Sequence, residues 1–215
     1  MTTVTPVDAA ARKSRSEAHL VQMGIPIDPS SPPLELSASV RPPEAIPARA
    51  ICLCLCAAKA EGLDPATVAS LVTNFHVGRY LRPPEVEFLY GTADASDQVN
   101  RFQWGYEACW ALLWVLGRLE TLDDPVARCD PQQAARIITT SGSITGLIGT
   151  LRSNDEIFDV ADLTHRFLDA CRQAGPPYEN LPGELICPVV YQRQLAFQWL
   201  LDPAGTRWEE IIVPI

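Results

Sequence analysis

The segment from residue 102 to residue 119 constrains the fold more than any other part of this chain. It holds nine consecutive apolar residues, from Ala108 to Leu116, with Trp104 beside that run and Trp114 within it. Eighteen residues without a turn signal exceed the length of an ordinary strand, so the segment is predicted to be a helix. Because apolar side chains surround its central turns, this helix belongs in a protein core or in a bilayer.

Length and charge exclude the bilayer. A helical span needs about twenty apolar residues, whereas Glu107 and Arg118 stand near the two ends of this shorter run. No alternating strand pattern of useful length occurs elsewhere in the chain. The prediction is therefore an all-α fold, a single helical domain around a central buried, Trp-rich helix over residues 102–119.

Helix start and stop signals divide the rest of the chain. Asp64-Pro65 and Asp130-Pro131 each combine an N-cap with a proline at the first helical position. Ser153 and Glu156 form an S-x-x-E capping box. Further helices are predicted over residues 8–23, 44–61, 65–75, 82–91, 132–140, 153–174 and 188–201, with a helical turn or short strand at 208–213. The glycine-containing segment 141–150 is the least determined.

A proline-rich arm is predicted near the N-terminus. Residues 25–43 contain six prolines, which remove hydrogen-bond donors and disfavour helix, so this stretch should run over the surface. We therefore divide the chain into residues 1–43, an N-terminal helix with its arm, and residues 44–215, the helical domain.

Charge and cysteine content limit the function classes. The formal net charge is -9, which repels nucleic acid and anionic membranes and favours either a basic protein as partner or simply solubility. The N-terminus is polar and resembles no secretory signal. Seven cysteines, an odd number, fit reduced thiols better than a disulfide framework, so a cytoplasmic location is expected.

A set of landmarks in fixed order resembles a known family. They are Arg12-Lys13-x-Arg15-Ser16, Gly24-Ile25-Pro26, Arg49-Ala50, Trp104-x-Tyr106-Glu107-Ala108, Leu113-Trp114-x-Leu116-Gly117, Asp162-Leu163-x-x-Arg166, Arg193-x-x-Ala196-x-x-Trp199-Leu200 and Trp208-Glu209. Their order is similar to that of the bacterial family called domain of unknown function 4272 (DUF4272). The resemblance spans nearly the whole chain. It implies a soluble bacterial helical protein and supplies no activity.

The chain departs from that family pattern at three places. Gly105 stands where the resemblance leads us to expect Arg, and Gln192 stands where we expect Glu. The tail, residues 213–215, lacks the expected acidic ending. If the family uses these positions in a polar site, this member has lost part of that site.

Two groups of residues suggest a metal site. Cys52, Cys54 and Cys56 form a C-x-C-x-C, but on a helix Cys54 points about 160° away from the other two. Tetrahedral zinc needs four ligands around one point, and no second Cys/His pair follows. These cysteines are therefore expected to be small buried residues.

The second group lies along one predicted helix. Asp162-x-x-His165 resembles half of a di-metal site, with Asp159 one turn before it and Glu107 as the candidate carboxylate from another helix. A run of acidic residues along a helix is more often its solvated side. A metal-dependent hydrolase using Glu107, Asp159, Asp162 and His165 is accordingly the alternative hypothesis.

The principal hypothesis is a protein-binding module without catalysis, of the immunity or adaptor kind. The chain has no G-x-S-x-G elbow, and Gly142, Gly146 and Gly149 lack the Lys-Ser/Thr of a phosphate loop, so no cofactor is expected. The acidic stretch 155–169 is the predicted surface for a basic protein partner. Neither nucleic acid nor a membrane is expected to bind.

A buried polar contact is also predicted. Glu107 lies on the most apolar helix, and Arg193 lies on the apolar helix 188–201. An unpaired charge in either place would cost several kcal/mol, so the two side chains are expected to face each other. Arg166 is the alternative partner for Glu107. This ion pair either belongs to the core or lines a ligand pocket.

Overall fold

The computed structural model of the chain is all-α. It describes residues 6–35, 40–91, 96–179, 181–202 and 204–214, and within these ranges no residue is in a β-strand. The α-helices are α1 (Pro6–Gln22), α2 (Ala45–Ala60), α3 (Pro65–Asn74), α4 (Pro83–Tyr90), α5 (Ser96–Phe102), α6 (Gly105–Val115), α7 (Pro131–Ser141), α8 (Asn154–Ala174) and α9 (Cys187–Leu201). Short 3-10 helices lie at Gly78–Tyr80, Thr145–Leu147, Pro182–Glu184 and Trp208–Glu210.

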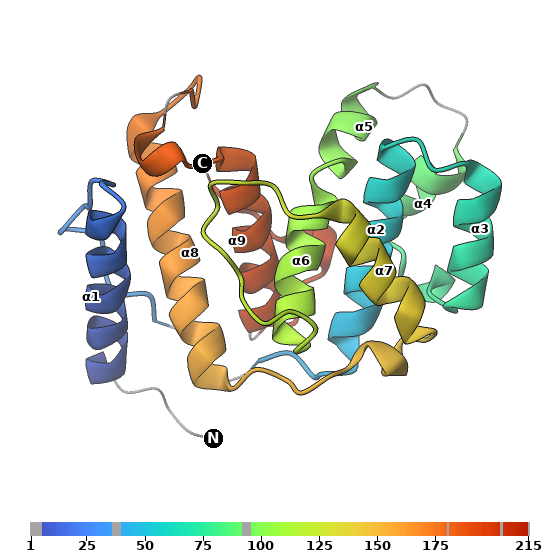
Figure 1. Ribbon diagram of the computed structural model, residues 1–215, viewed down its shortest axis with the longest axis horizontal. Coiled ribbons are helices and arrows are strands. Elements are labelled where there is room, and N and C mark those ends of the chain that lie inside the picture. The colour runs from blue at the N-terminus through green and yellow to red at the C-terminus, as the bar shows by residue number, and fades with distance from the viewer. Residues whose placement is uncertain (1–5, 36–39, 92–95, 180, 203, 215) are drawn as a thin grey trace.

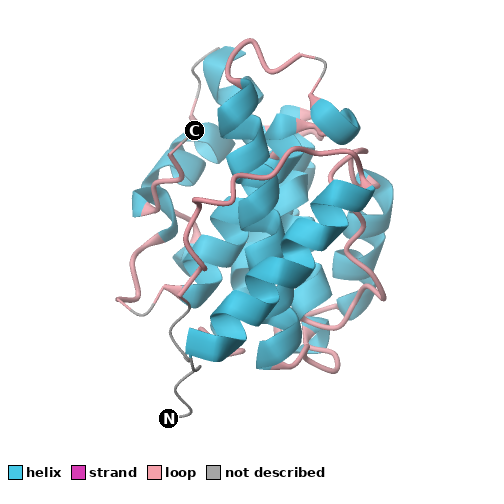
Figure 2. Ribbon diagram, turned by 90° about the vertical axis from the view of Figure 1, so that its left-hand side faces the viewer, coloured by secondary structure: helices cyan, strands magenta, loops and turns pink. Residues whose placement is uncertain are grey.

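Helix α6 lies in the middle of the molecule. It packs against α2 on one side and α9 on the other, α9 packs against α8, and α8 packs against α1 (Figure 1). The view turned by 90° shows these long helices running in roughly similar directions (Figure 2). Nearly every residue of α6 is buried, and Ala108, Leu112 and Leu113 are fully inaccessible to solvent. The predicted central buried helix is therefore confirmed.

The bounds of the central helix were predicted too widely. Phe102 ends α5 rather than starting α6, and its ring stacks on Phe88 of α4 at 4.5 Å. At the other end, α6 stops because Gly117 adopts a positive φ of 70° beside the returning chain. A Cβ there would lie 1.9 Å from the carbonyl oxygen of Thr150, so this close approach requires glycine.

Segment 141–150 is that returning chain, and it has a definite structural role. The backbone N–H of Gly149 donates to the carbonyl of Leu116 at 2.9 Å, and the N–H of Arg152 donates to that of Val115 at 3.1 Å. The last carbonyls of a helix have no partner within the helix. The segment that looked least determined therefore caps the C-terminus of α6.

The predicted helix starts have the expected caps. The Asp64 and Asp130 carboxylates accept hydrogen bonds from backbone N–H groups in the first turns of α3 and α7. Ser153 and Glu156 form the capping box of α8. The C-terminal segment forms a 3-10 turn at Trp208–Glu210 rather than a strand.

The proline-rich arm is irregular but firmly attached. Its described residues, 25–35 and 40–43, form neither helix nor strand. Ile25 is 2% exposed in a small apolar cluster between α1 and α8, so the arm does not lie wholly on the surface. Arg166 of α8 donates to the Ser31 hydroxyl at 2.5 Å and to the Pro32 carbonyl at 2.8 Å. A buried arginine thus ties the arm to α8.

No helix among the described residues is both long enough and apolar enough to cross a membrane.

Candidate functional site

A cleft of about 160 Å³ opens between α2, α4, α5, α9 and the C-terminal segment. Its walls combine apolar side chains with charged ones, and we call it the arginine cleft. It is lined by Leu53, Arg82, Pro84, Glu85, Arg101, Phe102, Gly105, Tyr191, Gln192, Leu195, Trp208, Glu209 and Ile211. Apolar walls with a few convergent polar groups are the usual make-up of a binding site.

The base of the cleft holds a buried ion pair. Arg49 of α2 and Glu85 of α4 are each 3% exposed, and an Nη of Arg49 donates to an oxygen of Glu85. Arg49 lies one turn before Leu53, and its guanidinium stacks over the Trp208 ring, 5.1 Å from the centroid. Its Nε and other Nη have no hydrogen-bond partner among the described residues. A buried guanidinium with spare donors therefore contacts two residues of the cleft wall, Glu85 and Trp208.

Arg82 and Glu209 form the rim above that pair. The Arg82 backbone N–H donates to Glu85 at 2.8 Å, so Glu85 both caps α4 and neutralises Arg49. The Arg82 side chain lies 3.5 Å from Glu209, too far for a good hydrogen bond. The Arg82 Nε and the Glu209 Oε2 are both buried, and neither has a hydrogen-bond partner among the described atoms.

Alternating guanidinium and indole groups fix the C-terminal wall of the cleft. Arg41 stacks over Trp199 at 4.5 Å, Trp199 meets Trp208 edge to face at 5.6 Å, and Trp208 is stacked by Arg49. Cation–π contacts of this kind are worth more when they are desolvated, and both indoles are buried. The series joins the arm, α9, the C-terminal turn and α2, so Trp208 is held rigidly in the cleft wall.

A larger and more open hollow of about 690 Å³ lies beside α7. One of its arginines, Arg118, already donates to the carbonyls of Gly146, Leu147 and Ile148. The side chain of the other, Arg136, is 71% exposed. Neither arginine combines burial with spare donors, so this hollow is the weaker candidate.

The predicted contact between Glu107 and Arg193 is present. An Nη of Arg193 lies 3.2 Å from the Glu107 carboxylate, and both side chains are at most 5% exposed. The other Glu107 oxygen accepts from the Cys129 N–H at 2.7 Å, and Arg193 also donates to the Asp123 carbonyl. The adjacent hollow is only about 20 Å³, roughly the space of one water. This pair accordingly fastens α9 to α6, and the hollow beside Arg193 is too small for a ligand.

The two aspartates of the metal hypothesis, Asp159 and Asp162, bind arginines and are not arranged around a metal. Asp159 pairs with Arg12 at 3.2 Å and Arg15 at 2.6 Å, and the fully buried Asp162 pairs with Arg166 at 3.3 Å. Arg166 therefore contacts Asp162 and the arm rather than Glu107. The side chain of Asp162 faces the interior, contrary to the interpretation of this acidic run as a solvated face.

His165 lies on the same helix, 3.7 Å from Asp169. Burial lowers the pKa of its imidazole, against the opposing effect of that carboxylate. Nowhere in the part of the chain that the structure describes do three or more His, Cys, Asp or Glu side chains come together as metal ligands.

The predicted acidic surface 155–169 is largely neutralised. Asp169 accepts hydrogen bonds from Ser31, Arg166 and Arg172, in addition to the arginine contacts of Asp159 and Asp162. These carboxylates are already bonded within the protein, so they offer little uncompensated charge to a basic partner.

The cysteines of α2 are buried in the core, as are Cys109, Cys171 and Cys187. Burial raises the pKa of the Cys52 thiol to about 12 and raises that of Cys56 well above its ordinary value. The thiolate is the metal ligand and the nucleophile, so these residues are kept in the unreactive form.

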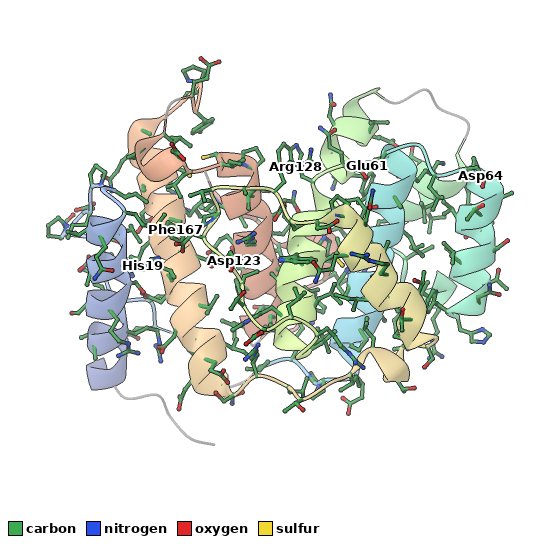
Figure 3. The ribbon with its side chains drawn as sticks, in the orientation of Figure 1. His19, Glu61, Asp64, Asp123, Arg128 and Phe167 are labelled. Carbon is green, nitrogen blue, oxygen red and sulfur yellow. The ribbon has the colours of Figure 1, made fainter. Side chains whose placement is uncertain are left out.

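Two contacts hold the long loop before α7 against the body. The His19 imidazole lies 2.9 Å from Asp124, one residue after Asp123, and 6.3 Å edge-on from the Phe167 ring (Figure 3). At the other end of the loop, Arg128 lies 3.8 Å from Glu61. The first contact is half-buried and the second is exposed, and we assign both to positioning the loop.

Sequence reasoning did not single out the arginine cleft. In the sequence, Arg49 and the Trp208-Glu209 pair are landmarks of the family resemblance, which assigns them no role. The sequence contains one indication of the cleft. Gly105 and Gln192, two positions that depart from the pattern of the resembled family, both line it. Glu85 and Arg82 gave no signal of their own, since R-P-P-E looks like an ordinary helix start.

The comparisons with known proteins give one match. A family model described as "Domain of unknown function (DUF4272)" matches residues 12–211. No curated protein and no solved structure matches the chain.

Proposed function

Because this chain belongs to the DUF4272 family, whose description assigns no activity, we propose from its geometry that it acts as a protein-binding module. The binding site is the arginine cleft. The protein contributes shape and charge there, and each of the cleft's carboxylates, Glu85 and Glu209, lies beside a guanidinium.

The observation that carries the proposal is the cleft's charge in an acidic chain. Arg49, Arg82 and Arg101 lie at or under the cleft against two carboxylates, whereas the whole chain has a net charge of -9. A local positive site on an acidic protein steers an acidic group toward one place on its surface.

The size of the cleft favours a protein partner. Sites for drug-sized ligands and cofactors occupy about 300–1,000 Å³. At about 160 Å³ this cleft is too small for them and suits a single anchoring side chain of a larger partner. The surrounding surface would then supply the remaining contact area.

Selection from a library of random peptides displayed on phage with free C-termini tests the proposal. The bait is the wild-type protein, and the comparison variant is Gln192→Trp, which fills the cleft from its α9 side. The control is Gln132→Trp on the exposed face of α7, far from the cleft residues in the chain. Enriched peptides should bind wild type and Gln132→Trp alike and lose binding to Gln192→Trp. Equal binding to all three proteins would place the interaction elsewhere.

A further inference from the structure

We propose that the arginine cleft binds the C-terminal residue of a partner protein. The apolar side chain of that residue enters the cleft, and its free carboxylate lies against the guanidinium groups of Arg82 and Arg101. This inference rests on the proposed function and specifies the chemistry of the occupant.

The apolar walls of the cleft fit one side chain. A cavity of about 150 Å³ lined by apolar residues is enough for one benzene-sized group. The cleft has about 160 Å³, with Leu53, Phe102, Leu195, Trp208 and Ile211 in its walls. A side chain the size of Leu or Phe would fill it and displace water from these walls.

The guanidinium groups on the rim of the cleft are incompletely neutralised. Glu85 is already bonded to Arg49 and to the Arg82 backbone, so it offers little to a rim arginine. Glu209 lies 3.5 Å from Arg82 and shares its charge with Arg207 at 3.8 Å. Among the side chains that the structure describes, no carboxylate pairs with Arg101, which packs 5.7 Å from the Phe102 ring. A carboxylate from outside would complete this set, because guanidinium forks match carboxylate geometry.

A terminal residue meets both requirements at once. It carries its side chain and its carboxylate on one Cα, whereas an internal Asp or Glu beside an apolar residue needs two residues in a one-residue cleft. The buried Glu209 Oε2 lies 3.5 Å from Arg82 but has no hydrogen-bond partner among the described atoms, so it can accept a hydrogen bond from the last peptide N–H. Placing an acceptor beside the two arginines thus suits a peptide chain end better than a bare anion.

Titration of isotope-labelled full-length protein with short peptides, followed by two-dimensional NMR, tests the inference. The probes are Gly-Ser-Gly-Ser-Gly-Phe and Gly-Ser-Gly-Ser-Gly-Leu with free carboxylates, the same peptides with C-terminal amides, and the amidated internal acid Gly-Ser-Gly-Asp-Phe-Gly. At least one free-acid peptide should shift the resonances of Phe102, Leu195 and Trp208. The amides and the internal acid should bind at least about tenfold more weakly, the loss expected for one charge-assisted contact.

Two arginine variants separate the cleft from general charge effects. Arg82→Gln should weaken free-acid binding about tenfold and leave the amide's affinity unchanged. Arg79→Gln removes an exposed arginine that contacts Tyr80 outside the cleft, and it should bind like wild type. Thermal melting of each variant checks that both remain folded.

Each remaining outcome decides against the inference. Equal binding of acids and amides at the cleft would remove the carboxylate from the recognition and keep the cleft as a binding site. Equal binding of the internal acid would remove the chain end. If no free-acid peptide shifts the cleft resonances at millimolar concentration, the inference is wrong, whereas the phage selection with Gln192→Trp still decides the proposed function independently.

Discussion

Replacing Glu107 and Arg193, singly and together, tests how α6 and α9 are joined. The variants are Glu107→Gln, Arg193→Met and the double replacement. In the wild type, Glu107 accepts one hydrogen bond from Arg193 and one from the Cys129 N–H, and both charged side chains are almost inaccessible to solvent. Each single variant leaves a buried group without its main partner, while the double variant removes both charges.

The expected magnitudes follow from this geometry. Two unit charges 3.2 Å apart attract by about 5 kcal/mol at an effective dielectric constant of 20. Withdrawing each ion from water costs several kcal/mol, so the intact pair contributes little net stability. Loss of one partner leaves an uncompensated buried charge and should lower the free energy of unfolding by about 3–5 kcal/mol. The double variant should lose far less than the sum, giving a coupling energy of about 2 kcal/mol or more.

Urea unfolding followed by tryptophan fluorescence measures these free energies, since the chain has five tryptophans. An exposed pair serves as the control cycle. Arg207 and Glu210 form an ion pair with side chains 61% and 46% exposed, and solvent screening should make their coupling much smaller than that of the buried pair. Additive losses at Glu107 and Arg193, with coupling no larger than in the control cycle, would refute the reasoning.

Three further predictions concern other parts of the molecule. Subtilisin should cut wild type first within residues 25–43, and faster in Arg166→Met, which releases Ser31 and Pro32; first cleavage within α6 would contradict this assignment. His165 has a lowered pKa, so protonation favours the unfolded chain. The stability that the neutral His165 contributes is complete above pH 6.5 and is lost as the pH falls below that value. Urea titrations at several pH values should show this loss in the free energy of unfolding of the wild type and not in that of His165→Gln. Native protein should react slowly with a thiol reagent at pH 8, because burial raises the pKa of Cys52 to about 12, and all seven thiols should react in denaturant.

Local signals in the sequence were enough to predict most of the helical elements. Asp64, Asp130 and Ser153 cap helices through contacts with residues two or three positions away, so neighbouring residues contain the whole signal. The apolar run after Gly105 likewise indicated which helix is buried. The family was also identified correctly from the order of its landmarks.

Features that depend on distant contacts were predicted less well. The central helix ends early because Gly117 meets Thr150, 33 residues later in the chain, and no local signal reports such an approach. The pairing of Glu107 with Arg193 could be inferred because a buried charge needs a partner. The arginine cleft could not, since Arg49, Glu85 and Glu209 come together only when α2, α4 and the C-terminal segment are assembled.

The attachment of the arm to α8 has a consequence for the order of folding events. Arg166 and Ser31 are 135 residues apart in the chain, whereas most of the contacts that build α8 lie within a few residues of each other. Closing so long a loop is entropically unfavourable until the intervening helices are in place. Contacts of this kind are expected to form after the transition state. Weakening them should then speed unfolding and leave the refolding rate nearly unchanged, so the arm would govern the lifetime of the native state more than the speed at which it forms.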